Sequence, residues 1–154
     1  MHRHKNLPHT PPTWVDPSRE IWFITICCEP RGHNQLATPN VGPGLLESVG
    51  FRSELGHWHP YLFVLMPDHC HGLMAFNLDS SMKQTITDWK RWTARNLGVG
   101  WQPDFFDHRL RKEEGFEEKA RYIRQNPVRA GLVSEADEWP YVWNAPEGFS
   151  GICR

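Results

Sequence analysis

The chain has 154 residues, a formal net charge of −1 and 39% hydrophobic residues, which is a composition typical of globular proteins. No apolar run approaches the roughly 20 residues that span a membrane, and no signal peptide is recognisable. We therefore expect a cytoplasmic protein with one domain over residues 1–154. The charge balance excludes a strongly basic protein, although a basic face on one side would still suit nucleic acid. The four cysteines lack Cys-x-x-Cys spacing, which favours reduced thiols.

The first part of the chain predicts an arm, a strand and a helix. Residues 1–19 are rich in histidine and proline, which indicates an extended surface arm that either serves only as an arm or contacts a phosphate backbone. Residues 20–28, EIWFITICC, are apolar on both faces, as in a central strand. Residues 29–44 predict a loop. Residues 45–55 predict a helix that Gly50 weakens.

Residues 57–76, HWHPYLFVLMPDHCHGLMAF, predict two apolar strands joined by a tight turn at Pro67-Asp68. Side chains two positions apart on a strand point to the same face, so His69 and His71 share a face while Cys70 packs on the other as a small hydrophobe. Two imidazoles on a rigid strand supply half of a divalent-metal site. A purely structural or surface pair stays open, because nine histidines make this spacing common by chance.

The next segment predicts a helix that Asp79-Ser80 caps and that ends at Leu97. Its apolar stripe has helical spacing and comprises Met82, Ile86, Trp89, Thr93 and Leu97. The opposite face carries four basic residues, Lys83, Lys90, Arg91 and Arg95, against the single acidic Asp88. This face is either an ordinary solvated surface or part of a track for a polyanion.

Residues 101–111, WQPDFFDHRLR, predict a further strand with Phe106, His108 and Leu110 on one face. Arg109 and Arg111 either line a DNA path or simply close the sheet. Residues from Glu113 onward predict a helix that Pro127 stops, and residues 144–154 form a tail.

This order of elements predicts an α+β fold of the ferredoxin-like, split βαβ kind. In that fold an antiparallel sheet carries helices on one face, and here a C-terminal helix follows. The first and third strands are neighbours at the centre of such a sheet. The pair His69 and His71 is therefore expected in the middle of the sheet, where a rigid site can be built.

The last predicted helix places Tyr122 and Asn126 four residues apart, on one face. One interpretation is structural, with Tyr122 at the helix edge and Asn126 as the residue that ends the helix before Pro127. The other interpretation is chemical. Two imidazoles and an amide oxygen suit Mg²⁺ or Mn²⁺, which would neutralise charge on a phosphodiester while the tyrosine attacks it.

Several segments together resemble one known family: MPDHCHGL, WKRW, WQPDFFDHRLR, YIRQNPVRAGLV and EWPYVW. They are similar to the REP-associated tyrosine transposases, which belong to the HUH single-strand DNA endonucleases with one tyrosine. The resemblance spans roughly residues 20–143. It implies that His69, His71 and Asn126 bind the metal and that Tyr122 is the nucleophile. The implied product is a 5′-phosphotyrosine on single-stranded DNA beside a hairpin.

We therefore expect a metal-dependent endonuclease and strand transferase that uses Mg²⁺ or Mn²⁺ and acts on single-stranded or hairpin DNA, as a monomer or homodimer. Lys83, Lys90, Arg91, Arg95, Arg109 and Arg111 are the candidate DNA contacts. One alternative is a catalytically inactive single-strand-binding module on the same fold. Another is a metal-dependent hydrolase of small phosphate esters, in which the tyrosine has no role.

Overall fold

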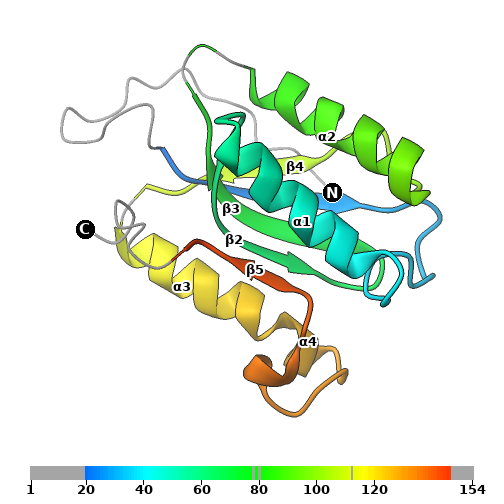
Figure 1. The fold of residues 1–154 in the computed structure, drawn as a ribbon. Coiled ribbons are helices and arrows are strands. Elements are labelled where there is room, and N and C mark those ends of the chain that lie inside the picture. The colour runs from blue at the N-terminus through cyan, green and yellow to red at the C-terminus, as the bar shows by residue number, and fades with distance from the viewer. Residues whose placement is uncertain (1–19, 78, 80, 112, 147–154) are drawn as a thin grey trace.

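The computed structural model describes residues 20–77, 79, 81–111 and 113–146, so the predicted arm at 1–19 and most of the predicted tail lie outside the described residues. Five strands form one antiparallel sheet in the order β4-β1-β3-β2-β5 (Figure 1). Their bounds are β1 Trp22–Cys27, β2 His59–Leu65, β3 His69–Ala75, β4 Phe106–Arg109 and β5 Val142–Asn144. The predicted α+β fold is confirmed, with β1 and β3 as neighbours.

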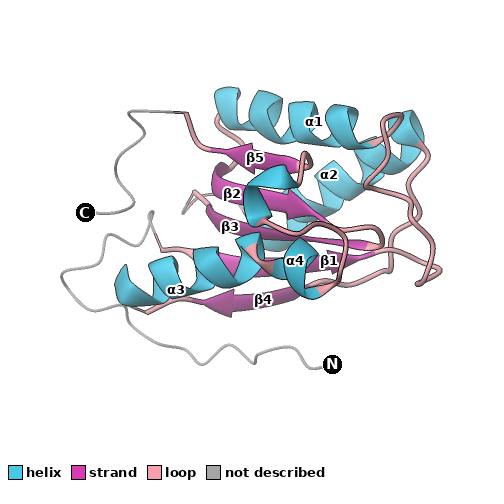
Figure 2. Ribbon diagram, turned by 90° about the horizontal axis from the view of Figure 1, so that it is seen from below, coloured by secondary structure: helices cyan, strands magenta, loops and turns pink. Residues whose placement is uncertain are grey.

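Helices cover both faces of the sheet (Figure 2). The longer helices α1 (Gly42–Glu54) and α2 (Met82–Leu97) lie on one face, where they enclose the larger hydrophobic cluster. Helix α3 (Glu113–Arg124) lies on the other face over a smaller cluster, and the short α4 (Asn126–Arg129) follows it. A 3₁₀ turn, η2 (Ala136–Glu138), precedes β5.

The alternation of side chains along β3 assigns each residue to one of these two layers. Cys70 and Met74 lie in the cluster under α1 and α2, and Cys70 is fully buried. Leu73 lies in the cluster under α3, so His69 and His71 project from the α3 face. The prediction that Cys70 packs as a hydrophobe opposite the histidines is confirmed.

Several predicted element boundaries were wrong. The helix predicted to run from Glu113 to a stop at Pro127 ends at Arg124, and Pro127 lies in the first turn of the separate helix α4, where proline is tolerated. The predicted strand at residues 101–111 is broken, because only Trp101 bridges to Cys28 and β4 begins at Phe106. Pro103 lies in this gap and has no N–H to donate to a sheet. Helix α2 is capped by Ser81, whose hydroxyl accepts a hydrogen bond from the Gln84 N–H (3.1 Å), and not by Asp79-Ser80.

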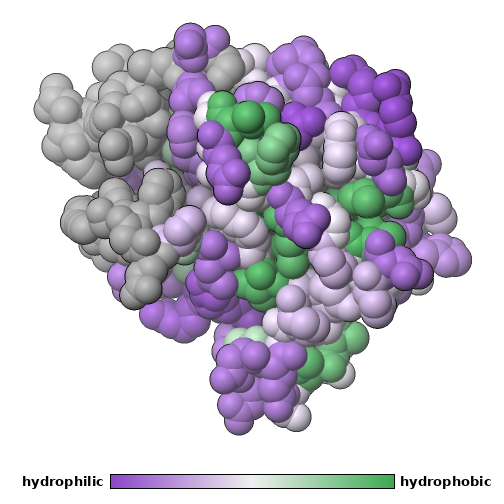
Figure 3. Space-filling model, viewed as in Figure 1, coloured by the Kyte–Doolittle hydropathy of each residue, from purple (hydrophilic) through white to green (hydrophobic). Residues whose placement is uncertain are grey.

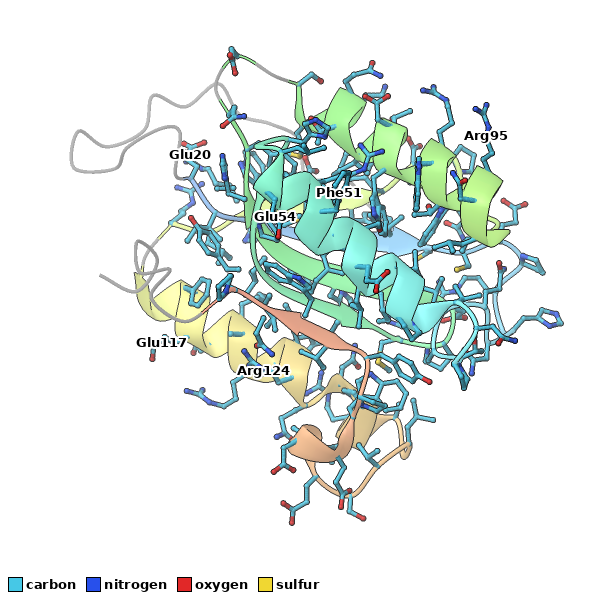
Figure 4. The ribbon with its side chains drawn as sticks, in the orientation of Figure 1. Glu20, Phe51, Glu54, Arg95, Glu117 and Arg124 are labelled. Atoms are coloured by element: carbon cyan, nitrogen blue, oxygen red, sulfur yellow. The ribbon has the colours of Figure 1, made fainter. Side chains whose placement is uncertain are left out.

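Strand β5 was not predicted, and its packing explains the glycine inside α1. The indole of Trp143 lies against α1, and a Cβ added at Gly50 would lie 2.9 Å from its Nε1 atom. Gly50 costs helix propensity, but it lets α1 approach the edge strand. On the other face Arg124 reaches from α3 toward β5 (Figure 4), where Nη2 donates a hydrogen bond to Oδ1 of Asn144 (2.6 Å).

Candidate active site

The two histidines lie at the start of β3, directly after the turn at Pro67-Asp68. Their ring centroids are 4.9 Å apart and the rings are nearly perpendicular, at 76°. His71 is only 8% exposed, whereas His69 is partly open to solvent. The pair is therefore held by the sheet on one side and reachable from the other.

Each imidazole is oriented through its Nδ1 atom by a different segment. Nδ1 of His69 donates a hydrogen bond to Oδ1 of Asp68 (2.9 Å). Nδ1 of His71 is hydrogen-bonded to Oγ1 of Thr25 on β1 (2.9 Å), the residue that pairs with it across the sheet. Because both Nδ1 atoms are engaged, the Nε2 atoms are the ones left for an external ligand. Contacts of this kind typically fix metal-binding histidines.

Asp68 connects the histidine pair to the loop after β1. It accepts hydrogen bonds from Nε of Arg31 (2.9 Å) and from the Gly32 N–H (2.9 Å), in addition to the one from His69. Partial burial of this carboxyl raises its pKa, but the hydrogen bonds from Arg31, His69 and Gly32 outweigh that effect and lower the pKa below its usual range. Asp68 is therefore a carboxylate at neutral pH and a stable acceptor for His69.

Burial gives His71 the protonation state that a metal ligand needs. It lowers the pKa of His71 to about 3, and the nearby charges of His69, Arg129 and Lys119 act in the same direction. The imidazole is consequently neutral at pH 7, with a lone pair available on nitrogen.

The donor set fits a divalent cation only if a neutral oxygen completes it. Within the described ranges, no group of three His, Cys, Asp or Glu side chains is placed to hold a metal ion. Asn126 opens α4, four residues after Tyr122, and its side chain is half-buried. Two imidazoles and an amide oxygen leave coordination positions open for water and substrate, as Mg²⁺ or Mn²⁺ would require.

Tyr122 lies on α3 and is connected to His71 through a series of ring contacts. Its side chain is 51% exposed, with the guanidinium of Arg129 at 4.0 Å and the ammonium of Lys119 at 5.4 Å from the ring centroid. The same ammonium lies 4.8 Å from the ring centroid of Phe23. Phe23 in turn stacks on the imidazole of His71, with centroids 5.3 Å apart.

The residue after the tyrosine fixes the position of α3. Ile123 is fully buried in the cluster beneath this helix, whereas Tyr122 next to it is exposed. Burial of an aliphatic side chain contributes about 1.5–3 kcal/mol, so Ile123 helps to hold the exposed tyrosine at one place over the sheet.

The predicted basic track on α2 lies on the opposite face of the sheet from the histidines. Lys83, Arg91 and Arg95 are exposed, and Arg95 points away from the sheet (Figure 4). The surface on that side is mixed, with hydrophobic groups interrupting hydrophilic ones (Figure 3). The reacting strand of a DNA ligand would therefore not meet these side chains at the histidine pair.

Lys90, the fourth residue predicted for that track, is buried, with 9% of its surface exposed. Its ammonium donates hydrogen bonds to the carbonyl oxygens of Gln102 (2.7 Å), Pro103 (3.2 Å) and Asp104 (3.3 Å). Lys90 thus stabilises the irregular segment before β4, and its charge is not presented to a ligand.

Of the other two predicted cations, Arg109 pairs across the sheet with Trp22, which packs in the cluster under α1 and α2, so its side chain projects from the face opposite the histidines. Both Arg109 and Arg111 line the groove between β4 and α3. This groove has a volume of about 590 Å³, and its lining comprises His108, Arg109, Leu110, Arg111, Gly115, Glu118 and Lys119. Nη1 of Arg109 is paired with Oε2 of Glu20 (2.6 Å), which reduces its availability to a phosphate. Arg111 is exposed and remains a candidate contact.

Five residues that shape this site were not predicted from the sequence: Phe23, Thr25, Asp68, Lys119 and Arg129. The positions of Phe23, Thr25 and Asp68 depend on strand register or on the turn. The positions of Lys119 and Arg129 depend on how α3 and α4 lie over the sheet. The one available signal was Asp68, which precedes the histidine triplet directly.

Comparisons with known proteins agree with this architecture. No protein-family profile matches the chain. A segment covering 51% of the chain is 27% identical to the REP-associated tyrosine transposase of Escherichia coli (strain K12). The match spans 50% of that protein's length. An uncharacterised protein of Haemophilus influenzae is 23% identical over 72% of this chain and 82% of its own.

Among solved structures, a REP-associated tyrosine transposase bound to a REP hairpin superimposes with a TM-score of 0.72 and 20% identity. The superposition covers 92% of this chain and 82% of that one, so the two share a fold. The predicted resemblance is thereby confirmed, in part of the sequence and in the fold.

None of the helices among the described residues has the length and apolar character needed to cross a membrane.

Proposed function

Because this chain is similar in part of its sequence and in its fold to REP-associated tyrosine transposases, we propose that it is a metal-dependent endonuclease and strand transferase. Its substrate is single-stranded DNA beside a hairpin, in line with the REP hairpin bound in the related structure. The observation that carries the proposal is the continuous set of contacts between Tyr122, Lys119, Phe23 and His71. It connects a nucleophile to a pair of oriented imidazoles.

His69, His71 and Asn126 would hold Mg²⁺ or Mn²⁺, which supplies charge neutralisation at the reacting phosphodiester when it is bound. Thr25 and Asp68 keep the two imidazoles oriented. Tyr122 acts as the nucleophile: its hydroxyl oxygen forms a bond to phosphorus and loses its proton to solvent. The bond from phosphorus to the 3′ oxygen breaks, and that oxygen takes up a proton.

The products are a 5′-phosphotyrosine at Tyr122 and a free 3′-hydroxyl. One phosphodiester is exchanged for another, so the energy of the broken bond is retained. A 3′-hydroxyl from another strand can then attack the phosphotyrosine, which joins the strands and restores Tyr122. The exposure of Tyr122 suits a nucleophile that must meet two DNA ends in succession.

The experiment is a denaturing-gel shift with labelled single strands that contain hairpins from the flanks of the gene. The protein is incubated with each strand and Mn²⁺, with and without chelator. We expect a slower, heat-stable covalent band that requires Mn²⁺ and disappears in Tyr122→Phe. Tyr141→Phe is the matched control, because Tyr141 packs against the cluster under α1 and α2, on the face of the sheet opposite the histidines.

A covalent band that persists in Tyr122→Phe would exclude this tyrosine as the nucleophile. Tight binding of hairpin strands without any covalent band would favour the inactive binding module. Metal-dependent hydrolysis of a small phosphate ester that survives Tyr122→Phe and ignores DNA would favour the hydrolase.

A further inference from the structure

Arg129 is held against Tyr122 at two points. Its guanidinium stacks on the tyrosine ring, 4.0 Å from the centroid, and Nη2 donates a hydrogen bond to the backbone carbonyl of Tyr122 (2.8 Å). A surface arginine normally samples many rotamers, and it loses this freedom when it is immobilised. Here the ring and the carbonyl restrict the side chain, so its charge has a defined position beside the tyrosine.

Lys119 brings a second cation to the same tyrosine from the preceding turn of α3. Its ammonium lies between two rings, 5.4 Å from the centroid of Tyr122 and 4.8 Å from that of Phe23. Phe23 stacks on His71, so Lys119 stands over the path from the tyrosine to the histidine pair. Among the ion pairs of the described residues, none includes Lys119 or Arg129.

Two cations held by aromatic faces near one point repel each other unless an anion lies between them. Cation–π contacts use the charge and not the N–H donors of a cation, so Lys119 and Arg129 keep N–H groups that can donate, apart from the Nη2 N–H of Arg129 that binds the Tyr122 carbonyl. A guanidinium and an ammonium are the groups that bind phosphate oxygens, the first as a planar fork and the second as a point charge.

We propose that Lys119 and Arg129 form an anion site that takes the non-bridging oxygens of one particular phosphodiester, the one that Tyr122 attacks. This inference rests on the proposed function and deepens it. The two cations position the phosphate before reaction and oppose the negative charge that develops on it. They act as binding groups, and the bond changes at phosphorus remain those of the tyrosine reaction.

The test is a binding measurement that needs no cleavage. Single strands with a REP-type hairpin are prepared as a set in which each member carries one neutral methylphosphonate linkage, at a different place. Fluorescence anisotropy with chelator present gives the dissociation constant for each member. Lys119→Gln and Arg129→Gln are compared with Arg121→Gln, which removes the same charge from an exposed position on the same helix.

In the wild type we expect one linkage at which neutralisation weakens binding about tenfold, the size of a charge-assisted hydrogen bond. In Lys119→Gln and Arg129→Gln, neutralising that linkage weakens binding by less than about threefold. In Arg121→Gln it still weakens binding about tenfold. Arg129→Lys, which keeps the charge and loses the planar stack, restores part of the sensitivity. Circular dichroism confirms that each variant is folded.

A purely structural role for the two cations would give a different pattern. The variants would then bind every member of the set more weakly by the same factor, and the sensitive linkage would stay sensitive. That result, or a wild type with no single sensitive linkage, overturns the anion site alone. Failure of the wild type to bind any hairpin strand overturns the proposed function and this inference with it.

Discussion

The hydroxyl oxygen of Thr25 lies 2.9 Å from Nδ1 of His71, across the antiparallel pair of β1 and β3. The other imidazole is oriented from the turn, by Asp68. The two rings thus depend on two separate segments, one a strand interior and the other a turn that Arg31 ties to the loop after β1. Each segment fixes which ring nitrogen is free for a ligand.

Replacing Thr25 tests this orientation directly. Thr25→Val keeps the branched shape and removes the hydroxyl, so we expect the affinity for Mn²⁺ to fall about tenfold or more. Thr25→Ser keeps the hydroxyl and should bind Mn²⁺ nearly as the wild type does. Isothermal titration calorimetry at pH 7 measures both. Equal affinity in Thr25→Val and wild type would show that the hydroxyl does not orient His71.

The burial of His71 predicts how the free energy of unfolding depends on pH when a chelator keeps the protein free of metal. The pKa of His71 is lowered to about 3 in the folded chain, against about 6.5 when unfolded. Between these values the unfolded chain binds a proton that the folded chain refuses, so the free energy of unfolding falls as pH falls from 6.5. The loss is about 1.4 kcal/mol per pH unit.

Urea unfolding of the wild type and of His71→Gln at pH 6.5, 5.5 and 4.5 measures this contribution. The slope of the free energy of unfolding against pH is compared between the two proteins, because the substitution also changes stability at every pH. We expect this free energy to fall more steeply with falling pH in the wild type. The lowered pKa of Asp68 means that its stabilising contribution is lost as pH falls toward and below its unfolded value of about 4. Both proteins carry Asp68, so this contribution cancels between their two slopes. Parallel slopes would mean that His71 takes up a proton in the folded chain.

The order of strands and helices was predictable because each element carries a clear pattern. The run EIWFITICC and the two strands around Pro67-Asp68 are apolar and bounded by turn residues. Strand β5 has only three residues and follows Pro140, so its local signal is weak. It forms because Trp143 packs on α1 at Gly50, a contact between distant parts of the chain.

The chemistry of the site was partly predictable for a related reason. Spacing in sequence placed His69 with His71 on one face of a strand, whereas Tyr122 and Asn126, predicted on one helix, lie on α3 and at the start of α4. The partners Thr25, Lys119 and Arg129 follow from strand register and from the packing of α3 and α4, which spacing does not encode. Helical spacing also placed Lys90 on a face that was either an ordinary solvated surface or a basic track, whereas its ammonium binds three backbone carbonyls.

Removing the Lys90 ammonium should therefore reduce stability. Lys90→Met keeps the aliphatic stem and leaves the carbonyls of residues 102–104 without their donor. We expect the free energy of unfolding to fall by about 2 kcal/mol, measured in urea at pH 7. Lys83→Met on the exposed side of the same helix should change it by less than about 0.5 kcal/mol. Similar values for the two variants would show that the ammonium adds nothing.

We expect DNA to contact the groove beside α3 and not the basic side chains of α2. Lys83 and Arg95 lie on α2, across the sheet from His71, whereas Arg111 lies at the groove beside α3. For single strands, each phosphate contact contributes about 0.7 to the slope of log affinity against log salt concentration. Arg111→Gln should therefore reduce the slope by about 0.7, while the Lys83→Gln/Arg95→Gln pair should leave it unchanged.

Anisotropy titrations of a hairpin strand over a series of salt concentrations give these slopes. The rate of covalent product at saturating DNA is measured on the same variants. We expect that rate to stay within about twofold of wild type in the α2 pair, because neither side chain lies on the face of Tyr122 and the histidines. A slope reduced by about 1.4 in the α2 pair would show instead that DNA wraps behind the sheet, and the basic face of α2 would then be a true DNA track.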